Sequence, residues 1–337
     1  MNESSAIFEI IHSIMQDPST EKLSVLEMCQ LAGVSRSGSY AWVKAAPIRD
    51  AQEAQDRQDF NLILEAYKYR GYDKGARGIY MRLMHMDPPI VMNVKKIRRL
   101  MDKYNLTCPI RKANPYRRMA KALKTSNVAD TIIQREFECY GPRTVLLTDI
   151  TYLPYNGTFV YLSTILDAYT KQVLAYVPSD FNLEVDFVLE TVKMLIRDHG
   201  ISLNQWTVIH SDQGVHYTSY KFIEIVRNQK LRQSMSRRGN CWDNAPQESF
   251  YGRMKDHIKE KLKACKTYNE VVAVIDDYMD YYNNDKYQWE LAKLSPNEFY
   301  DFYMTGIYPL KVDKAPSVPS PEKKPSELQH NIKSDPS

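Results

Sequence analysis

The sequence lacks the marks of a membrane or secreted protein. None of its apolar runs is long enough to cross a bilayer, and the start Met1-Asn2-Glu3 does not have the basic and then apolar order of a secretory signal. Its cysteines are far apart, without the paired spacings of zinc sites or disulfide frameworks, so we expect reduced thiols. They are Cys29, Cys108, Cys139, Cys241 and Cys265. No internal repeat is evident, and we expect a cytoplasmic protein with no membrane partner.

Charge is distributed unevenly along the 337 residues. The formal net charge is only +4, but the stretch from Val91 to Thr125 holds eleven cations and one anion, Asp102. Residues 94–101 within it have helical periodicity, with apolar side chains on one side and cations on the other. The cations are Lys95, Lys96, Arg98 and Arg99. Such a run is often only a solvated face, but because this helix has a core side as well as a polyanion-facing side, we expect it to contact DNA phosphates.

The first third of the chain has a helical pattern. The segment from Ser24 to Trp42 indicates two short helices around a turn at Ala32-Gly33-Val34, with Ser35 capping the second helix and Arg36 on its surface. This arrangement resembles a helix-turn-helix that reads DNA, and the alternative is a plain packing unit. We expect a helix-turn-helix-like module at 1–46, a second helical DNA-binding module at 55–108, a basic linker at 109–138, an α/β core at 139–306 and a disordered, proline-rich tail at 307–337.

Three acidic residues of the core lie in three different local settings. Asp149 is within an apolar, β-rich run, and Asp212 directly follows another such run, so both belong at or near strand ends. Glu248 follows Pro246 by two residues and begins a pattern of apolar residues at every fourth position, which predicts an amphipathic helix with proline in its first turn. The pattern consists of Phe250, Met254, Ile258 and Leu262.

Three convergent carboxylates suit hard divalent cations such as Mg²⁺, which prefer oxygen ligands. Two ions held about 4 Å apart can activate an attacking oxygen and stabilise the leaving oxygen at phosphorus. Each acid alone would be read as a cap or a solvated charge. The spacing favours a shared site, because thirty-five residues separate Asp212 from Glu248 and Lys255 follows Glu248 by seven, on the same helix face.

These motifs resemble those of the OrfB-type insertion-sequence transposases, whose catalytic core is similar to that of retroviral integrases. The resemblance covers most of the chain and rests on several motifs in the family's order. They are Thr148-Asp149-Ile150-Thr151-Tyr152, His210-Ser211-Asp212-Gln213-Gly214, Gly239-Asn240-Cys241 with Asp243-Asn244-Ala245 before Glu248, Tyr281-Tyr282-Asn283 and Ser295-Pro296. The departures are Leu146 where the family usually has tryptophan, Lys286 in place of arginine and Gln288 in place of histidine.

The resemblance implies that Asp149, Asp212 and Glu248 are the catalytic and metal-binding residues and that Lys255 orients terminal phosphates. The loop with Arg237 and Arg238 has the charge to close on DNA, and an exposed basic turn without a partner is the alternative. The order of predicted elements fits an RNase-H-like mixed sheet with helices on both faces, in which the first and fourth strands lie side by side.

The expected function is that of a bacterial insertion-sequence transposase, which cleaves element ends and joins them to target DNA with two Mg²⁺ ions, for which Mn²⁺ can substitute. The implied partners are double-stranded DNA, further copies of the chain on that DNA, and the product of an upstream reading frame. A nucleoid-associated, cytoplasmic enzyme is therefore expected. Two alternatives stay open: a catalytically inactive DNA-binding regulator, and a metal-dependent RNase-H-like nuclease or resolvase that cuts without joining.

Overall fold

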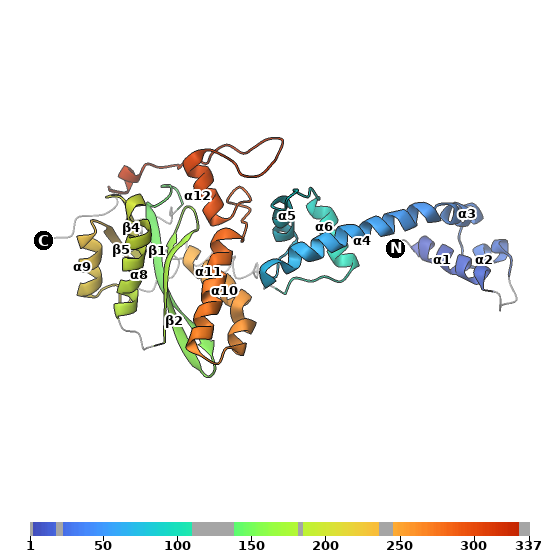
Figure 1. Cartoon of the computed structure of the whole chain (residues 1–337). Helices are drawn as coiled ribbons and strands as arrows, with labels where there is room; N and C mark the ends of the chain where they lie inside the picture. The colour runs from blue at the N-terminus through green and yellow to red at the C-terminus, as the bar shows by residue number, and fades with distance from the viewer. Residues whose placement is uncertain (1–2, 18–22, 110–137, 181–184, 236–244, 330–337) are drawn as a thin grey trace, which may run out of the picture.

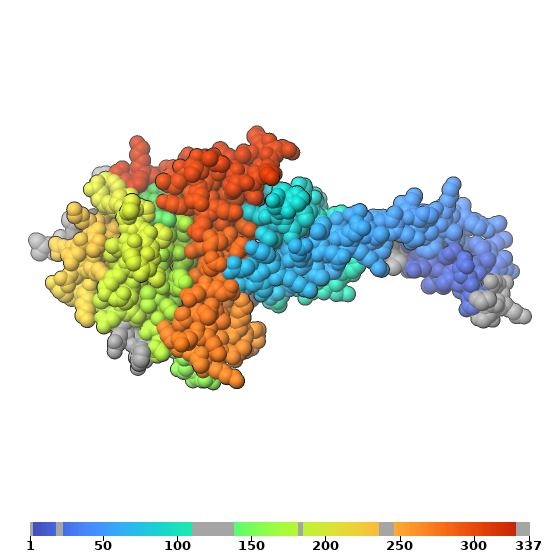
Figure 2. All heavy atoms as spheres, in the orientation of Figure 1, coloured from blue at the N-terminus to red at the C-terminus, as the bar shows by residue number. Residues whose placement is uncertain are grey.

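The computed structural model describes residues 3–17, 23–109, 138–180, 185–235 and 245–329. Three parts follow one another along an elongated molecule (Figures 1 and 2). An α/β domain forms one end, a helical module that contains the long helix α4 lies beside it, and a small three-helix module forms the other end. No helix within the described ranges is long and apolar enough to cross a membrane.

The α/β domain is built on a five-stranded mixed sheet in the order β3-β2-β1-β4-β5. Its strands are β1 (Val145–Tyr155), β2 (Thr158–Asp167), β3 (Val173–Ser179), β4 (Val208–Ser211) and β5 (Arg232–Met235). The three consecutive strands β1, β2 and β3 pair antiparallel, whereas β4 pairs parallel with β1 and β5 pairs parallel with β4. The RNase-H-like order expected from the sequence, with the first and fourth strands adjacent, is confirmed.

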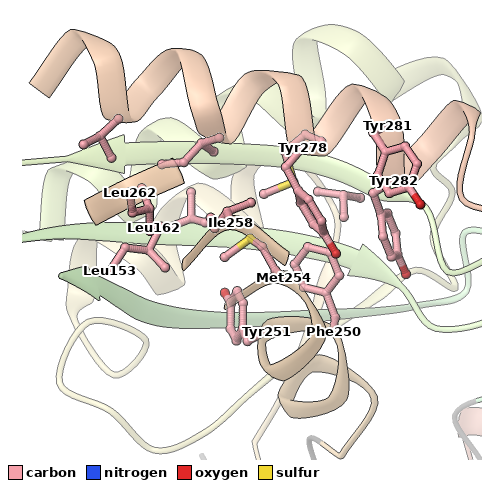
Figure 3. Packing of buried hydrophobic residues seen from close by; sticks show 14 of the residues in the cluster. Leu153, Leu162, Phe250, Tyr251, Met254, Ile258, Leu262, Tyr278, Tyr281 and Tyr282 are labelled. Carbon is pink, nitrogen blue, oxygen red and sulfur yellow. The ribbon is translucent and has the colours of Figure 1, made fainter. Parts of the chain in front are cut away.

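Helices cover both faces of this sheet. On one face lie α8 (Val185–His199) and α9 (Tyr220–Asn228), and on the other lie α10 (Ala245–Ala264) and α11 (Tyr268–Asn284). Successive strand residues point to opposite faces, so Leu146 packs with the α8 side whereas Leu153 packs with the α10 side. The predicted apolar stripe of α10 is confirmed, because all four of its residues are buried in the core shown in Figure 3.

The chain beyond the sheet ends in α12 (Pro296–Thr305), whose N-terminus carries a capping box between Ser295 and Glu298. The described part of the tail, residues 307–329, is mostly exposed and makes hydrogen bonds to main-chain oxygens elsewhere in the chain. The hydroxyl of Tyr308 donates to the main-chain oxygen of Ala292 at 2.8 Å, and the amide of Lys323 donates to the main-chain oxygen of Cys139 at 3.0 Å. A proline-rich composition thus does not prevent this segment from following the surface of the core.

The second module consists of α4 (Ala46–Lys68), the short 3-10 turn η1 (Tyr69–Gly71), α5 (Ala76–Met84) and α6 (Val94–Lys103) around its own apolar core. The sequence division left residues 47–54 between two modules, but they lie in the N-terminal part of α4. This part of α4 is polar and lacks apolar periodicity. Ion pairs to α6 begin at its end, where Lys103 contacts Glu53, and continue at Asp56, which Arg99 and Lys103 both contact.

The N-terminal module contains α1 (Glu3–Gln16), α2 (Val25–Leu31) and α3 (Arg36–Lys44). The predicted helix pair is present, with Gly33 at φ +64° in the turn and the Ser35 hydroxyl accepting from the amide of Gly38 at 3.3 Å. A left-handed residue of this kind favours glycine, because a Cβ there is strained.

Candidate active site

Asp149 and Asp212 lie at the same edge of the sheet. The parallel pairing of β1 with β4 matches Leu147 to His210, and each aspartate lies two residues beyond that pair. Asp149 is half-buried in β1, whereas Asp212 is exposed in the turn after β4. Parallel strands bring their carboxyl ends to one edge, so the two acidic side chains come from neighbouring strands at the same level.

The turn after β4 holds Asp212 by its own backbone. Its Oδ1 accepts a hydrogen bond from the amide of Gly214 at 2.9 Å. A Cβ built on Gly214 would lie 2.9 Å from the same oxygen, which is closer than real Cβ atoms approach. Glycine at this position therefore allows the carboxylate and the main chain to come together.

Glu248 is delivered by the first turn of α10, where it is exposed. The helix is fixed to the sheet next to Asp149, because the hydroxyl of Tyr251 donates to the main-chain oxygen of Asp149 at 2.6 Å. The same hydroxyl lies 2.8 Å from Oγ1 of Thr164 on β2, and the Gln247 amide also donates to Thr164. These bonds join β1, β2 and α10 at the centre of the site.

A strict four-residue repeat that begins at Phe250 would leave Tyr251 on the exposed side of α10. Tyr251 is only 5% exposed and packs in the core beside Phe250 (Figure 3). Its neighbour Gly252 is exposed, as expected, and a Cβ there would meet nothing within 4 Å. Since Tyr251 follows the stripe residue Phe250, the helix buries a wider strip than a strict four-residue repeat indicates.

The three acidic residues interact through their charges. Burial, followed by the charges of Asp212 and Glu248, raises the pKa of Asp149 to about 7, although the amide of Ile150 and the Lys255 ammonium act in the opposite direction. Oδ1 of Asp149 accepts from that amide at 2.8 Å. Both strand aspartates thus direct an oxygen toward a main-chain N–H group.

In this structure the three carboxylates are not arranged as ligands of one metal ion. Among the described residues, no three aspartate, glutamate, histidine or cysteine side chains are gathered as ligands of one ion. Like charges repel one another, and local amide hydrogen bonds compete for the same oxygens. The three candidate residues thus come from β1, from the turn after β4 and from α10, and their role as metal ligands stays a prediction.

Lys255 lies about two helical turns after Glu248 on α10. Its charge interacts with that of Asp149. Burial lowers its pKa, and its Nζ lies 4.9 Å from the ring centroid of Tyr152. It also lines a pocket of about 530 Å³ beside the β1–β2 turn, together with Lys259 and Lys263. A cation therefore lies near Asp149, and its role in orienting phosphates stays a prediction.

The other predicted DNA-binding residues fall into three groups. On α6, Lys95 and Arg98 are exposed, whereas Lys96 forms an ion pair with Asp59 and Arg99 forms one with Asp56. Arg36 is exposed at the start of α3, with its guanidinium 5.6 Å from the ring centroid of Tyr40. Arg237 and Arg238 lie outside the described residues. Half of the predicted α6 contact surface is thus already engaged within its own module.

Comparisons with known proteins agree with this geometry. The integrase core domain family matches residues 140–241, and a second integrase core domain family matches residues 229–296. An uncharacterized transposase-like protein of Haemophilus influenzae is 31% identical over 61% of this chain and 92% of its own length. The putative transposase InsK for insertion sequence element IS150 of Escherichia coli is 29% identical over 81% of this chain and 92% of its own length.

Among solved structures, the catalytic core domain of HTLV-2 integrase in complex with magnesium aligns with a TM-score of 0.36 and 16% identity, over 47% of this chain and 96% of that domain. The sequence relatives carry the assignment, and the observed strand order agrees with it. The chain belongs to the insertion-sequence transposases with an integrase-like core, enzymes that transfer DNA strands.

Proposed function

We propose that this transposase cleaves the ends of its element and joins them to target DNA at a site made by Asp149, Asp212 and Glu248. The observation that supports the proposal is the parallel pairing of β1 with β4, which brings Asp149 and Asp212 to one edge of the sheet, where α10 with Glu248 is fastened to β1. The raised pKa of Asp149, caused by burial and by the charges of Asp212 and Glu248, agrees with it. An enzyme gains nothing in stability from a half-buried carboxylate beside two others, so the arrangement is typical of a functional site.

The donor set fits Mg²⁺, with Mn²⁺ as a substitute, because all three candidate ligands are carboxylates and hard divalent ions prefer oxygen. When bound, two such ions would activate the attacking oxygen and stabilise the leaving oxygen of an in-line displacement. Asp149 and Asp212 would provide ligands from the sheet edge, and Glu248 would provide them from α10.

In the first reaction a water oxygen attacks phosphorus at the element end, the bond from phosphorus to the 3′ oxygen breaks, and a free 3′ hydroxyl results. In the second reaction that hydroxyl attacks a phosphodiester of another DNA segment, which forms one phosphorus–oxygen bond and breaks one. Lys255, whose ammonium lies beside the acidic site, would bind a phosphate oxygen and orient the strand. Tyr251 would keep α10 and β1 in register throughout.

We further propose that the DNA contacts extend over Lys95 and Arg98 of α6, Arg36 of α3 and the loop with Arg237 and Arg238. Double-stranded DNA would be bound by several copies of the chain, together with the product of an upstream reading frame. Joining of the two ends of one element to give a circular intermediate would precede integration. These partners follow from the family rather than from a contact within this chain.

A comparison of two substrates tests the proposal against a resolvase. The purified protein would be given labelled element ends and, separately, a four-way DNA junction, each with Mg²⁺ or Mn²⁺. We expect cleavage and joining of the linear ends and no preference for the junction. Cutting of the junction without any joining would contradict the proposal, and DNA binding without either reaction would favour a regulator.

A further inference from the structure

We propose a second DNA-backbone site, in the pocket of about 450 Å³ between α5 of the helical module and helices α10 and α11 of the core. It would bind one phosphate group of the duplex. The pocket is distinct from the acidic site, because its lining comes from residues 73–81, 253–257 and 281–287 and includes none of the three candidate metal ligands. The inference takes only the identity of the ligand, DNA, from the proposed function.

The walls of the pocket carry cations that lack acidic partners. Neither Arg77, Arg253 nor Lys286 forms an ion pair with a carboxylate among the described residues. The Nζ of Lys286 is 3.3 Å from the hydroxyl of Tyr278 and lies over the rings of Tyr278 and Tyr282. Burial and the neighbouring Arg253 lower the pKa of Lys286 to about 7. A phosphate would supply the negative charge that this ammonium lacks.

Two further groups make the pocket a preformed site. Lys74 is 6% exposed, and its Nζ donates to the main-chain oxygens of Tyr69 at 2.5 Å and Tyr72 at 2.6 Å, so its charge is fixed in place. The ring nitrogen Nδ1 of His257 is buried and has no hydrogen-bond partner within the described part of the chain. Burial, followed by Lys286 and Lys74, lowers the pKa of His257 to about 3. A neutral imidazole can still donate one N–H group to a phosphate oxygen.

The start of α5 adds main-chain donors. The cap residue Gly75 provides no side-chain hydrogen bond to the first turn, and a Cβ on Gly75 would meet nothing within 4 Å. The first amides of a helix have no partner within the helix and attract anions. Here they line the same pocket as the cations, so they would support a phosphate that the side chains already attract.

Acidic residues of the pocket reduce this positive charge only in part. Asp285 is engaged by the Arg70 guanidinium at 3.0 Å and by the hydroxyl of Tyr69 at 2.9 Å. Asp73 accepts from the hydroxyl of Tyr67 at 2.8 Å. Asp256 is exposed at the rim. Asp285 has a cationic partner in Arg70, whereas Asp73 keeps its charge beside a neutral hydroxyl. The four cations of the lining therefore outnumber its two carboxylates that form no ion pair with a described residue.

The location favours the phosphate of a duplex over a free anion. Arg253 lies five residues after Glu248 on α10, a rise of about 7.5 Å and a rotation of about 140°. The pocket and the acidic site therefore lie on different sides of one helix, close enough for one duplex to contact both. The opposite wall belongs to the module whose α6 exposes Lys95 and Arg98. A phosphate bound here would contact the module and the core at once and would hold their relative position on DNA.

The test measures the affinity of the full chain for a labelled duplex of arbitrary sequence over a series of salt concentrations. The double variant Arg77→Gln/Arg253→Gln removes two exposed charges of the pocket, and Lys193→Gln/Arg227→Gln on α8 and α9 removes two on the other face of the sheet as a matched control. Each lost phosphate contact makes the slope of log affinity against log salt shallower by about 0.9. We expect this change in the pocket variant and not in the control.

A second variant and a second ligand complete the design. Lys286→Met should make the slope shallower in the same way, and Arg253→Lys should restore much of the affinity; unchanged thermal unfolding shows that the variants fold. Inorganic phosphate is titrated calorimetrically in parallel. Equal slopes for the wild type and both pocket variants would overturn the proposal, and phosphate binding with unchanged DNA slopes would replace it with a free-anion site. Binding needs no catalysis, so these results do not depend on the acidic site.

Discussion

The hydroxyl of Tyr251 donates a 2.6 Å hydrogen bond to the main-chain oxygen of Asp149. This bond joins the helix that carries Glu248 to the strand that carries the first aspartate. Because Thr164 of β2 contacts the same hydroxyl at 2.8 Å, one buried side chain sets the relative position of three elements. The geometry of the acidic site thus depends on a residue that itself has no charge.

Tyr251→Phe is expected to lower the rate of DNA joining and to raise the metal concentration needed for half-maximal rate. The variant keeps the ring in the core but removes the hydroxyl, which costs about 1 kcal/mol in free energy of unfolding. The matched control is Tyr176→Phe, which removes a 2.9 Å bond to Asp276 away from the acidic site. Both variants should lose similar stability, and an equal metal requirement in both would show that Tyr251 has no positioning role.

Asp149→Asn is expected to stabilise the metal-free protein above pH 7. The pKa of Asp149 is raised to about 7 by burial and by its acidic neighbours, whereas an unfolded aspartate has a pKa of about 3.9. Between these values the folded state binds more protons than the unfolded state, so stability falls as pH rises from about 4 to 7. Because the site is partly solvated, we expect the variant to recover about 1–2 kcal/mol at pH 8.

With Mg²⁺ added, we expect the wild type to be more stable than Asp149→Asn. Mg²⁺ binds the folded wild type and stabilises it, whereas Asp149→Asn should respond weakly. Chemical unfolding at pH 5 and pH 8, with Mg²⁺ and with a chelator, measures all four conditions. If Asp149→Asn were less stable than the wild type at pH 8 without metal, the folded state would not be destabilised by the charge of Asp149, and the prediction would be contradicted.

Periodicity made the core of the enzyme predictable. The apolar runs at Asp149 and before Asp212 predict two strands, and the four-residue repeat after Glu248 predicts the buried face of α10. The positions of the three acidic residues in or beside these elements follow from those patterns. The role of Tyr251 could not be found in the same way, because a buried tyrosine in an apolar stripe gives the same pattern whether or not its hydroxyl is used. The hydrogen bonds from main-chain amides to the carboxylates of Asp149 and Asp212 also have no signal in the sequence.

Two cations of α6 are expected to contact DNA, and two others are expected to stabilise the helical module. Lys95→Gln/Arg98→Gln should weaken DNA binding and leave stability unchanged, because both residues are exposed and form no ion pair with a described residue. Lys96→Gln/Arg99→Gln should lower the free energy of unfolding by about 1–3 kcal/mol, since it removes partners of the buried carboxylate Asp56 and of Asp59. Salt-dependent DNA binding and chemical unfolding of the wild type and the two double variants distinguish the two effects, and equal losses of affinity in the two variants would contradict the division.

The ion pairs between α6 and α4 also explain why the sequence did not predict that residues 47–54 are part of a helix. Hydrogen bonds from Arg99 and then from Lys103 hold the pKa of Asp56 well below its usual range. Those partners are 43 and 47 residues away in sequence, and residues 47–54 have no apolar stripe. A helix stabilised by distant ion pairs therefore has the sequence pattern of a linker. The hydrogen bond from Lys323 in the tail to Cys139 likewise joins residues that are far apart in the sequence.

Arg70→Gln is expected to loosen the helical module from the core. Arg70 contacts three carboxylates of the core, those of Asp277, Asp280 and Asp285, at 2.7–3.2 Å. Its removal leaves these like charges without their shared partner and should cost about 1–3 kcal/mol. Small-angle scattering should show a larger radius of gyration, while Arg57→Gln, which breaks an exposed pair within α4, should leave the radius unchanged. An unchanged radius in Arg70→Gln would show that Tyr72, buried in the core, suffices for docking.

The most direct test of the catalytic site is metal-dependent joining of labelled element ends by the wild type and by Glu248→Gln. Glu260→Gln, an exposed position further along α10, is the matched control. The account predicts that Glu248→Gln loses cleavage and joining in both Mg²⁺ and Mn²⁺ while its affinity for DNA stays near that of the wild type, and that Glu260→Gln remains active. Joining by Glu248→Gln at the wild-type rate, or loss of its DNA binding together with its activity, would contradict the role assigned to this carboxylate.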